Sequence, residues 1–546
     1  MTNINGTSKT DNPPLPISKP CIIKLIFIFL ILFTACDKKQ KSSEKNIKGL
    51  LKTEEMEFRD KQGRRIILNG LNLVDKSLDG KYLEEYDYDL FKKFKKWGFN
   101  CVRLGILWAG VEPKPGQYNE EYLSQVDKWI QAAAEHEVYV ILDMHQDLYS
   151  MEYADGAPEW ATLDENKKHV TGAIWDDAYY LSPAVQTAFD NFWKNKKASD
   201  GIGVQDHYIQ MWDFLSKRYQ NQPYLIGYDL MNEPFNGSQT KIIMQKLFKK
   251  LSDIITEDSE KDSIPISQLK SDWLNVNKRL KYYKYFQDID NYKELLKPIV
   301  ELNKKFEKDK LQPMYQRIAN RIRERDKRRI LFLEHSYYSN IGVPTSIEPV
   351  KLKSGKTDPQ VAYAPHCYDL LTDTKSADKI NFNRNKYIFR TVYKSGRRMN
   401  IPILLGEWGA FYGTDNQKVV SSARTLINLI EKYKIGNTYW AYDKELEDKT
   451  YFKKGLLRPL PIKISGTLQK YDFNYKNSIL NCSWKEQSNI NAPTIIYLPW
   501  LKRDIREKIH LTPKSNAQII AKNGFGYLKI GKCKDSQVRE LKIDFN

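Results

Sequence analysis

Two short apolar segments, each followed by a glutamate, constrain the fold of this chain most strongly. The segment 225–231 runs directly into Asn232 and Glu233, and the segment 403–405 is separated from Glu407 by one glycine. Apolar segments of this length predict buried strands, and the proline after Glu233 prevents the first strand from continuing. Each segment therefore presents a carboxylate at the C-terminal end of a strand.

The two carboxylates are far apart in the sequence, but a barrel of parallel strands would bring them together. In such a barrel the C-terminal strand ends surround one mouth, and catalytic residues come from several of them. Hydrolysis of a glycosidic bond needs two carboxyl groups, because one protonates the leaving oxygen and the other attacks the anomeric carbon. A single glutamate would more simply be a solvated loop residue or a helix cap, so the hypothesis depends on the pair.

The length and the charge of the chain limit the other functions that it could have. With 546 residues it has room for a barrel of the usual ~250 residues and a further domain. The net charge of +19 comes from lysines spread over the whole sequence, and no nucleic-acid-binding motif accompanies it. We therefore expect no nucleic-acid partner, and a surface that favours anionic membranes.

The N-terminal residues have the pattern of a targeting segment. An apolar run at 25–33, flanked by lysines, is too short to span a bilayer, which needs ~20 residues. It ends in Thr-Ala before Cys36, and this pattern resembles the cleavage site of bacterial lipoproteins. We predict a lipoprotein-type signal peptide over 1–36, lipidation of Cys36 and a polar tether over 37–54. The protein would be a membrane-anchored lipoprotein of a bacterial cell envelope, with plain secretion as the alternative.

Four cysteines remain after the targeting segment, and they allow three disulfide pairings. Cys101 and Cys367 lie beside predicted barrel strands and are most simply small buried residues. A bridge between Cys482 and Cys533 is a further option. No cluster has the spacing of zinc ligands, and we expect neither a metal nor another cofactor.

Charged residues interrupt two of the apolar segments. Arg103 lies inside a predicted strand, where an unpaired charge would be very costly, so it needs a carboxylate partner. Asp143, His145 and Asp147 follow the next predicted strand. A lone histidine there would more often be a core residue with satisfied hydrogen bonds, but two acids and a histidine together favour a functional site.

Several of these motifs together resemble glycoside hydrolase family 5. That family carries Asn-Glu after the fourth barrel strand and a second Glu after the seventh, and both are present here in that order. The segments Asp-Met-His-Gln-Asp at 143–147 and Asn-Leu-Val-Asp-Lys at 72–76 are more similar to the endoglycoceramidase-like branch than to the cellulases. The resemblance covers residues 55 to about 445.

The resemblance implies an α/β fold, namely a (β/α)8 TIM barrel followed by a smaller C-terminal all-β sandwich. The barrel would occupy 55–448, with a charged helical insertion at about 237–309, and the sandwich 449–546. We assign the barrel strands to residues 66–72, 101–104, 139–142, 225–231, 330–333, 361–364, 403–405 and 437–441, and strands of the sandwich to 495–498, 518–521 and 527–530.

The resemblance also implies roles for individual residues. Glu233 would be the acid/base and Glu407 the nucleophile, with the pKa of Glu233 raised by the charge of Glu407. Arg103 would brace the nucleophile, although a salt bridge elsewhere is an alternative. The residues expected to contact the sugar, or in one case the nucleophile, are Lys76, His145, Asp147, Asn232, His366, Tyr368 and Trp440.

Two further features could belong to the site. Glu334, after the fifth predicted strand, is a rival carboxylate, for which a supporting role is the simpler interpretation. The long loop between Asp147 and Tyr208 contains Trp160, Trp175 and Tyr179, which we expect to form a cleft wall unless they only pack the loop. The insertion is interpreted as a charged helical excursion, with a lid over the cleft or a membrane-facing arm as the alternative.

The function that these patterns favour is that of a retaining endo-β-glycosidase that cuts the glycan from the lipid of glycosphingolipids embedded in a membrane, working as a monomer. One alternative is an endo-β-glucanase or mannanase of the same family, which would have an aromatic groove on both sides of Glu233. The other is a glycan-binding lipoprotein without turnover. The sequence leaves open the preferred headgroup and the role of the insertion.

Overall fold

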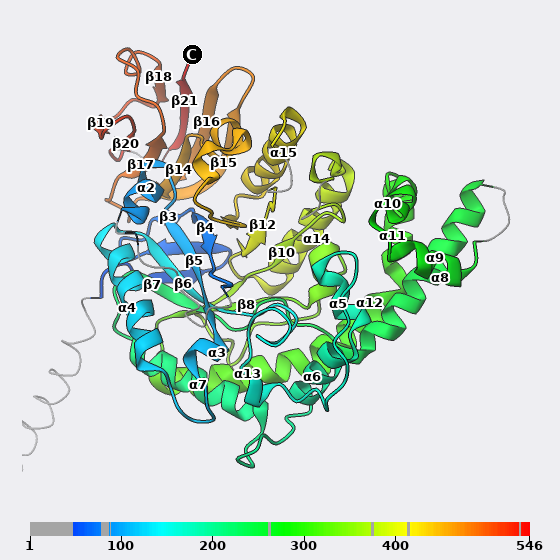
Figure 1. The fold of residues 1–546 in the computed structure, drawn as a ribbon. Helices are drawn as coiled ribbons and strands as arrows, with labels where there is room; N and C mark the ends of the chain where they lie inside the picture. Colours follow the sequence, from blue (N-terminus) through cyan, green and yellow to red (C-terminus); the bar gives the residue numbers. More distant parts are fainter. Residues whose placement is uncertain are drawn as a thin grey trace, which may run out of the picture. The chain divides into compact units, whose positions relative to one another are not determined.

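The computed structural model of the chain describes residues 47–77, 87, 89–259, 264–372, 376–411, 415–533 and 537–546 (Figure 1). Within them, one sheet consists of parallel strands connected mostly through helices. In spatial order its strands are β11 (Leu404–Leu405), β13 (Gly436–Tyr439), β4 (Asn69–Leu73), β5 (Cys101–Leu107), β6 (Tyr139–His145), β7 (Leu225–Asp229), β8 (Ile330–Leu333) and β9 (Val361–Tyr363).

A parallel bridge between Tyr363 and Ile403 joins the two outer strands of this sheet and closes it into a barrel. The backbone N–H of Tyr363 donates to the carbonyl of Pro402 at 2.9 Å across the seam. Tight strand contact explains Gly227 of β7, where a Cβ atom would lie only 2.2 Å from the carbonyl oxygen of Ile330. The sheet is therefore the TIM barrel that the sequence predicts.

Helices follow most of the barrel strands and cover the outside of the barrel (Figure 1). The main ones are α2 (Leu90–Lys96), α4 (Glu120–Glu135), α7 (Val204–Tyr219), α13 (Gln312–Arg325), α14 (Phe382–Met399) and α15 (Gln417–Tyr433), with the shorter α3 (Trp108–Val111) before α4. The connection from β8 to β9 carries only the 3-10 helix η7 (Tyr337–Ile341) within the described residues.

Helix α4 shows why these segments form amphipathic helices. Leu123, Val126 and Ile130 recur at helical spacing and are fully buried, so they form one apolar face. The side chain of Asn119 accepts hydrogen bonds from the backbone N–H groups of Glu121 and Tyr122 and caps the first turn.

The barrel strands differ from their predicted bounds mainly at the C-terminal ends. Strands β5 and β6 each continue three residues further, so Asp143 and His145 lie within β6 rather than after it. Strand β13 ends at Tyr439, which places Trp440 just beyond it. A short parallel pair, β10 (His366–Cys367) and β12 (Glu407–Trp408), extends the barrel at its mouth.

The C-terminal domain is the all-β sandwich that the sequence predicts. One sheet has the order β15 (Gly466–Asn474), β16 (Ile479–Glu486), β21 (Val538–Asp544) and β18 (Ile509–Thr512). The other contains β14 (Leu460–Ile464), β17 (Thr494–Leu498), β20 (Gly526–Ile530) and β19 (Ala517–Ala521). Trp484, Tyr497 and Leu468 are buried in the apolar core of this domain.

The first described strands join this sandwich sheet instead of starting the barrel. Strands β1 (Leu51–Glu54), β2 (Glu57–Asp60) and β3 (Arg65–Ile66) form an antiparallel meander, and β3 pairs with β14. Ile66 therefore belongs to β3, although the sequence places it in the first barrel strand. The meander also packs against the barrel floor, because Phe58 stacks on Phe332 of β8 at 6.1 Å between ring centroids.

The segment after β7 is helical, and it is more than a solvated excursion. Its helices are α8 (Thr240–Ser259), α9 (Ile266–Trp273), α10 (Val276–Arg279), η4 (Leu280–Phe286), α11 (Ile289–Leu296), η5 (Lys297–Ile299) and α12 (Val300–Phe306). Phe248, Leu251 and Phe286 are buried, whereas Ile242, Ile266, Leu274 and Val276 are exposed among charged residues. The helices of the insertion thus pack around apolar side chains of their own.

The four cysteines of the described residues are free thiols, so the suggested bridge between Cys482 and Cys533 is not formed. Cys101 and Cys367 are buried, as predicted. Among the helices of the described residues, none is long and apolar enough to cross a membrane. The predicted signal peptide, with Cys36, and most of the tether lie outside the described residues.

Candidate active site

The two glutamates of the opening hypothesis meet at the barrel mouth. Glu407 begins β12, and the register of β10 with β12 sets His366 beside it. Glu233 follows β7 with a left-handed backbone, φ 42°, and its N–H donates to the side chain of Glu334 at 2.9 Å. Glu334 thus supports the backbone of Glu233, which matches the supporting role considered for it.

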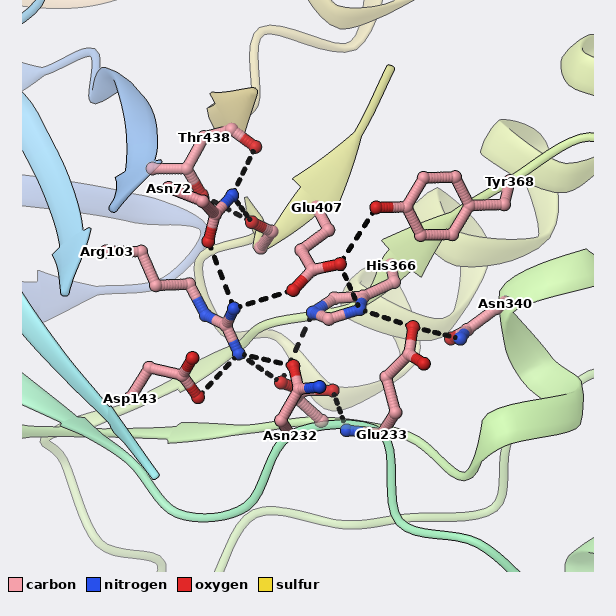
Figure 2. A network of polar contacts seen from close by, with 12 residues as sticks. Asn72, Arg103, Asp143, Asn232, Glu233, Asn340, His366, Tyr368, Glu407 and Thr438 are labelled. Atoms are coloured by element: carbon pink, nitrogen blue, oxygen red, sulfur yellow. Dashed lines mark hydrogen bonds and ion pairs between the residues drawn. The ribbon is translucent and has the colours of Figure 1, made fainter. Parts of the chain in front are cut away.

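Glu233 and Glu407 lie close together on either side of His366 (Figure 2). The Nδ1 atom of His366 is 2.9 Å from Glu233 Oε1 and 3.4 Å from Glu407 Oε2. One oxygen of each glutamate and this nitrogen all lie within 4.8 Å of one another. Carboxyl groups ~5 Å apart suit retention at the anomeric carbon, whereas inversion needs ~6.5 to 9.5 Å.

Arg103 is the centre of the buried polar network (Figure 2). It is fully buried on β5 and all three nitrogen atoms of its guanidinium group donate hydrogen bonds. The acceptors, at 2.7 to 3.0 Å, are Asn72, Asp143, Asp229, Asn232, Glu334 and Glu407. The partner that the sequence requires for Arg103 is therefore a ring of carboxylates from several strands, and Glu407 is one of them.

Two donors hold the carboxyl group of Glu407. Arg103 Nη1 donates to Oε1 at 2.9 Å, and the hydroxyl of Tyr368 donates to Oε2 at 2.8 Å. Charge-assisted bonds of this kind favour the carboxylate and fix its orientation. Only 4% of Glu407 is exposed, so its charge is barely screened by water.

Glu233 has the opposite electrostatic character. Burial raises its pKa to about 7, the hydrogen bond from His366 opposes this, and the charges of Glu407 and Asp147 add to it. The sequence argument assigned the rise to Glu407, but removal of water from the carboxyl group is the larger cause. Near neutral pH Glu233 therefore carries a proton for much of the time.

His366 lies behind the two glutamates instead of on the wall of the cleft. Burial lowers its pKa, but the charges of Glu334 and Glu407 outweigh burial and raise the pKa well above its ordinary value. A protonated imidazole between the glutamates supplies positive charge to both. The structure thus places His366 where it orients the carboxylates, and not in direct reach of a sugar.

A second polar cluster, around Lys76, also faces the cleft. The ammonium group of Lys76 pairs with Asp147, lies 3.7 Å from Asp155, and sits 4.7 Å from the centre of the Trp440 ring. Trp440 stacks on His145 with 5.3 Å between ring centroids. Lys76 lowers the pKa of Asp147 to about 2 against the effect of burial. A flat indole beside fixed charges is suited to hold a sugar ring.

Asn232 is fixed before any ligand binds. Its Oδ1 accepts from Arg103 at 2.9 Å, and its Nδ2 donates to the carbonyl of Gln146 at 3.0 Å. The amide therefore keeps one of its two N–H hydrogens for a sugar hydroxyl.

Glu233, Glu407, Asn232 and the cluster around Lys76 border one cavity of about 840 Å³, a size usual for ligand sites. Its polar wall, at the barrel mouth, consists of Lys76, His145, Asp147, Asn232, Glu233, Tyr368, Glu407 and Trp440. Its apolar wall comes from the insertion and consists of Met244, Leu247, Phe248, Leu251, Trp273, Tyr283, Phe286, Leu295 and Leu296. Trp175 and Tyr179 also border the cavity, as expected.

Trp160 does not border this cavity, contrary to the expectation. Its indole N–H donates to the carbonyl of Glu112 at 3.0 Å, and its ring packs on Trp108 and His207. Trp160 is therefore one of the aromatic residues that pack the long loop onto the barrel.

Two residues of the site have no counterpart among the sequence-based predictions. Asn340 Nδ2 donates to Glu233 Oε1 at 2.7 Å, and Asp155 is the second carboxylate beside Lys76. Asp155 is brought back by a turn after β6, and Asn340 by η7. Neither residue directly follows a barrel strand, so a prediction based on the residues at strand ends does not find them.

Three clusters of histidine and carboxylate atoms in the described residues are close enough to hold a cation. Asp143, Asp229 and Glu334 surround the guanidinium of Arg103, and Lys76 is paired with Asp147 of the second cluster. The third consists of Glu233, His366 and Glu407. Arginine, lysine and protonated histidine already supply positive charge to all three.

The family model for cellulases of glycosyl hydrolase family 5 matches residues 60–445, well over half of the chain. The chain belongs to glycoside hydrolase family 5. The model for the family 5 C-terminal domain matches residues 458–543, which is the sandwich. Both matches agree with the resemblance drawn from the strand-end motifs.

Relatives in sequence point to one part of this family. The endoglycoceramidase of Hydra vulgaris is 29% identical over 211 residues, which are 33% of this chain and 40% of that protein. Endoglycoceramidase I of Rhodococcus hoagii is 32% identical over 185 residues, 33% of this chain and 36% of that protein. The matched part thus spans about two fifths of these relatives.

Solved structures agree over a longer part of the chain. Endo-glycoceramidase II from Rhodococcus sp., in a ganglioside GM3 complex, superposes with a TM-score of 0.67 at 23% identity. The match covers 90% of this chain and 99% of that one. At this identity the likeness establishes the fold, including barrel and sandwich.

Proposed function

We propose that this protein is a retaining endo-β-glycosidase that cleaves the bond between the glycan and the lipid of glycosphingolipids. The observation that carries the proposal is the two-sided cavity, in which the glutamate pair lies between a polar wall and an apolar wall. A glycan carries many hydroxyl groups and a ceramide is hydrocarbon, so the substrate has the same two-sided chemistry. The endoglycoceramidase relatives support the same substrate class.

The mechanism follows from the electrostatics of the two glutamates. Glu407, oriented by Arg103 and Tyr368, attacks the anomeric carbon, while Glu233 donates its proton to the leaving oxygen and the carbon–oxygen bond to the lipid breaks. Water then attacks the anomeric carbon of the glycosyl-enzyme, Glu233 takes the proton from that water, and Glu407 leaves. Both displacements invert the centre, so the product keeps the β configuration.

The alternatives fit the cavity less well. A glucanase or mannanase binds sugar on both sides of the acid, which calls for an aromatic, polar groove and not a wall of leucines and phenylalanines. A glycan-binding protein without turnover has no use for a carboxyl group whose pKa is raised to about 7 beside an ionised carboxylate.

Incubation of the purified protein with a glycosphingolipid, and separately with a soluble β-glucan, tests the proposal. We expect intact oligosaccharide and free ceramide from the first and little sugar from the second. Cleavage of the glucan without release of ceramide would instead make the soluble polysaccharide the substrate.

We also propose that lipidation of Cys36 anchors the protein to a membrane of a bacterial cell envelope. The residues before Cys36 support this, and an anchored enzyme would meet a substrate that is itself in a membrane. Mass spectrometry of the mature protein should find acylated Cys36 at the N-terminus, and Cys36→Ser should release it from membranes. An unmodified, secreted chain would contradict the proposal.

A further inference from the structure

The acid Glu233 has an amide partner that neither the motifs nor the proposed mechanism uses. Asn340 Nδ2 donates to Glu233 Oε1 at 2.7 Å, on the same oxygen that contacts His366 (Figure 2). With Oε1 occupied by two donors, Oε2 is left as the oxygen that carries the proton toward the leaving group. Asn340 therefore helps to determine which of the two carboxyl oxygens carries the proton.

The orientation of the Asn340 amide is itself fixed by a buried histidine. Burial lowers the pKa of His335 to about 3, so its imidazole is neutral. Its Nδ1 lies 2.6 Å from the hydroxyl of Tyr363, and its Nε2 lies 2.9 Å from Asn340 Oδ1. A neutral imidazole that accepts from the tyrosine donates from Nε2, so the amide oxygen faces His335 and the NH2 group faces Glu233.

The helical insertion holds the turn that carries Asn340. The hydroxyl of Tyr292 on α11 donates to the carbonyl of Ile341 at 2.6 Å, and Thr240 at the start of α8 lies 2.5 Å from the hydroxyl of Tyr338. Asn303 of α12 donates to the side chain of Ser339 at 3.0 Å. Three helices of the insertion thus form hydrogen bonds to η7, at Tyr338, Ser339 and Ile341.

Two of these helices also form the apolar wall of the cavity. Met244 and Leu247 of α8, and Leu295 of α11, border the cavity from helices that contact η7 through Thr240 and Tyr292. We propose that Asn340 is a positioning residue for the acid Glu233, and that the insertion couples occupancy of the apolar wall to proton donation. The coupling rests on the proposed function, because the group that would occupy the apolar wall is the lipid. The positioning of Glu233 by Asn340 does not depend on the proposed function.

Charged and titratable groups around Glu233 determine how Asn340 should act on the pH profile. They are His366, Glu407, Glu334, Asp147, Tyr179 and Tyr337. Asn340→Ala keeps all of them and removes only a donor that favours the ionised form. The pKa of Glu233 should therefore rise, and the alkaline limb of kcat/KM should move to higher pH.

Substrates with different leaving groups distinguish a loss of acid catalysis from a general loss of activity. A glycosphingolipid has an alkoxide leaving group that needs the proton, whereas a 2,4-dinitrophenyl glycoside of the same sugar does not. For Asn340→Ala we expect kcat/KM, which reports the first displacement, to fall about tenfold on the lipid substrate and to change little on the dinitrophenyl glycoside. Equal losses on both substrates with an unmoved alkaline limb would overturn the positioning role.

A matched pair of hydroxyl deletions tests the coupling. Tyr292→Phe removes the bond to η7, whereas the control Tyr282→Phe removes a bond to Asp272 within the same insertion. We expect Tyr292→Phe to lower kcat on the lipid about fivefold, with equal thermal midpoints of the two variants. If they do not differ, the insertion does not act on the acid.

Assays of the same variants on soluble substrates test the role of Asn340 independently of the proposed lipid substrate. Methylumbelliferyl and dinitrophenyl cellobiosides report on Asn340 without any lipid. If the wild-type protein cleaves these but no glycosphingolipid, the proposed function and the coupling fall, whereas a shifted alkaline limb of Asn340→Ala on the methylumbelliferyl substrate still establishes the positioning role.

Discussion

The polar wall and the apolar wall of the cavity are built in different ways. The polar wall uses residues at the ends of barrel strands, fixed by a buried network of hydrogen bonds and ion pairs around Arg103. The apolar wall uses side chains of the helical insertion. The glutamate pair thus belongs to the barrel, whereas the apolar wall that would meet the lipid belongs to the insertion.

This comparison predicts that damage to the polar wall affects the reaction with every substrate, and that damage to the apolar wall affects lipid substrates alone. Four predictions follow from this difference, in order of decreasing effect.

Glu407→Gln should have the largest effect, because it removes the nucleophile from all substrates alike. We expect kcat to fall at least ~10⁴-fold on lipid and aryl glycosides, with substrate binding kept. Turnover assays and calorimetric titration of the variant with substrate would measure both quantities. Near-normal rates would remove Glu407 from this role.

Glu233→Gln should slow the first step only for substrates whose leaving group needs a proton. Loss of a general acid costs about 10²- to 10⁴-fold, and this loss should appear with the glycosphingolipid. With a dinitrophenyl glycoside the first step should survive and the glycosyl-enzyme should accumulate, because the base for the second step is missing. Trapping by added azide, followed by mass spectrometry, measures this; a loss of equal size in both first steps would contradict the acid role.

The pH profile should reflect the same group. Glu233 acts in its protonated form, so activity is present below its pKa of about 7 and is lost as the pH rises through that value. We expect kcat/KM on the lipid substrate to fall about tenfold for each pH unit above it. A rate that stays constant to pH 9 would show that another group is the acid.

Leu247→Gln should have the smallest effect and should spare soluble substrates. Leu247 of α8 borders the cavity and is half-buried, so a polar side chain there weakens binding of a hydrocarbon chain without emptying the core. We expect KM for the lipid to rise about tenfold and to stay unchanged for an aryl glycoside. Leu274→Gln, at an exposed position of the same insertion, is the matched control; an equal effect of both variants would argue against the apolar wall.

The polar wall could largely be predicted from the sequence, because the C-terminal ends of all the parallel strands of a barrel lie around one mouth. Glu233, Glu407, Arg103, Lys76, Asp147 and Trp440 all lie at or beside the barrel mouth, as their positions within or after predicted strands require. His366 was expected to line the sugar site, but the register of β10 with β12 sets it behind the glutamates.

The remaining features depend on contacts that no local pattern encodes. Asn340 reaches Glu233 because η7 folds back over the mouth, and Asp155 reaches Lys76 through a turn of the long loop. The pairing of β3 with β14 joins segments almost 400 residues apart. The insertion has an obvious helical pattern, but which of its faces borders the cavity follows only from tertiary packing.

The most direct test of the account is the anomeric form of the first product released from a glycosphingolipid, followed by proton NMR before mutarotation. A glutamate pair within 4.8 Å predicts that the intact oligosaccharide appears first as the β-anomer, together with free ceramide. First release of the α-anomer, or of single sugars with the lipid still glycosylated, would contradict it.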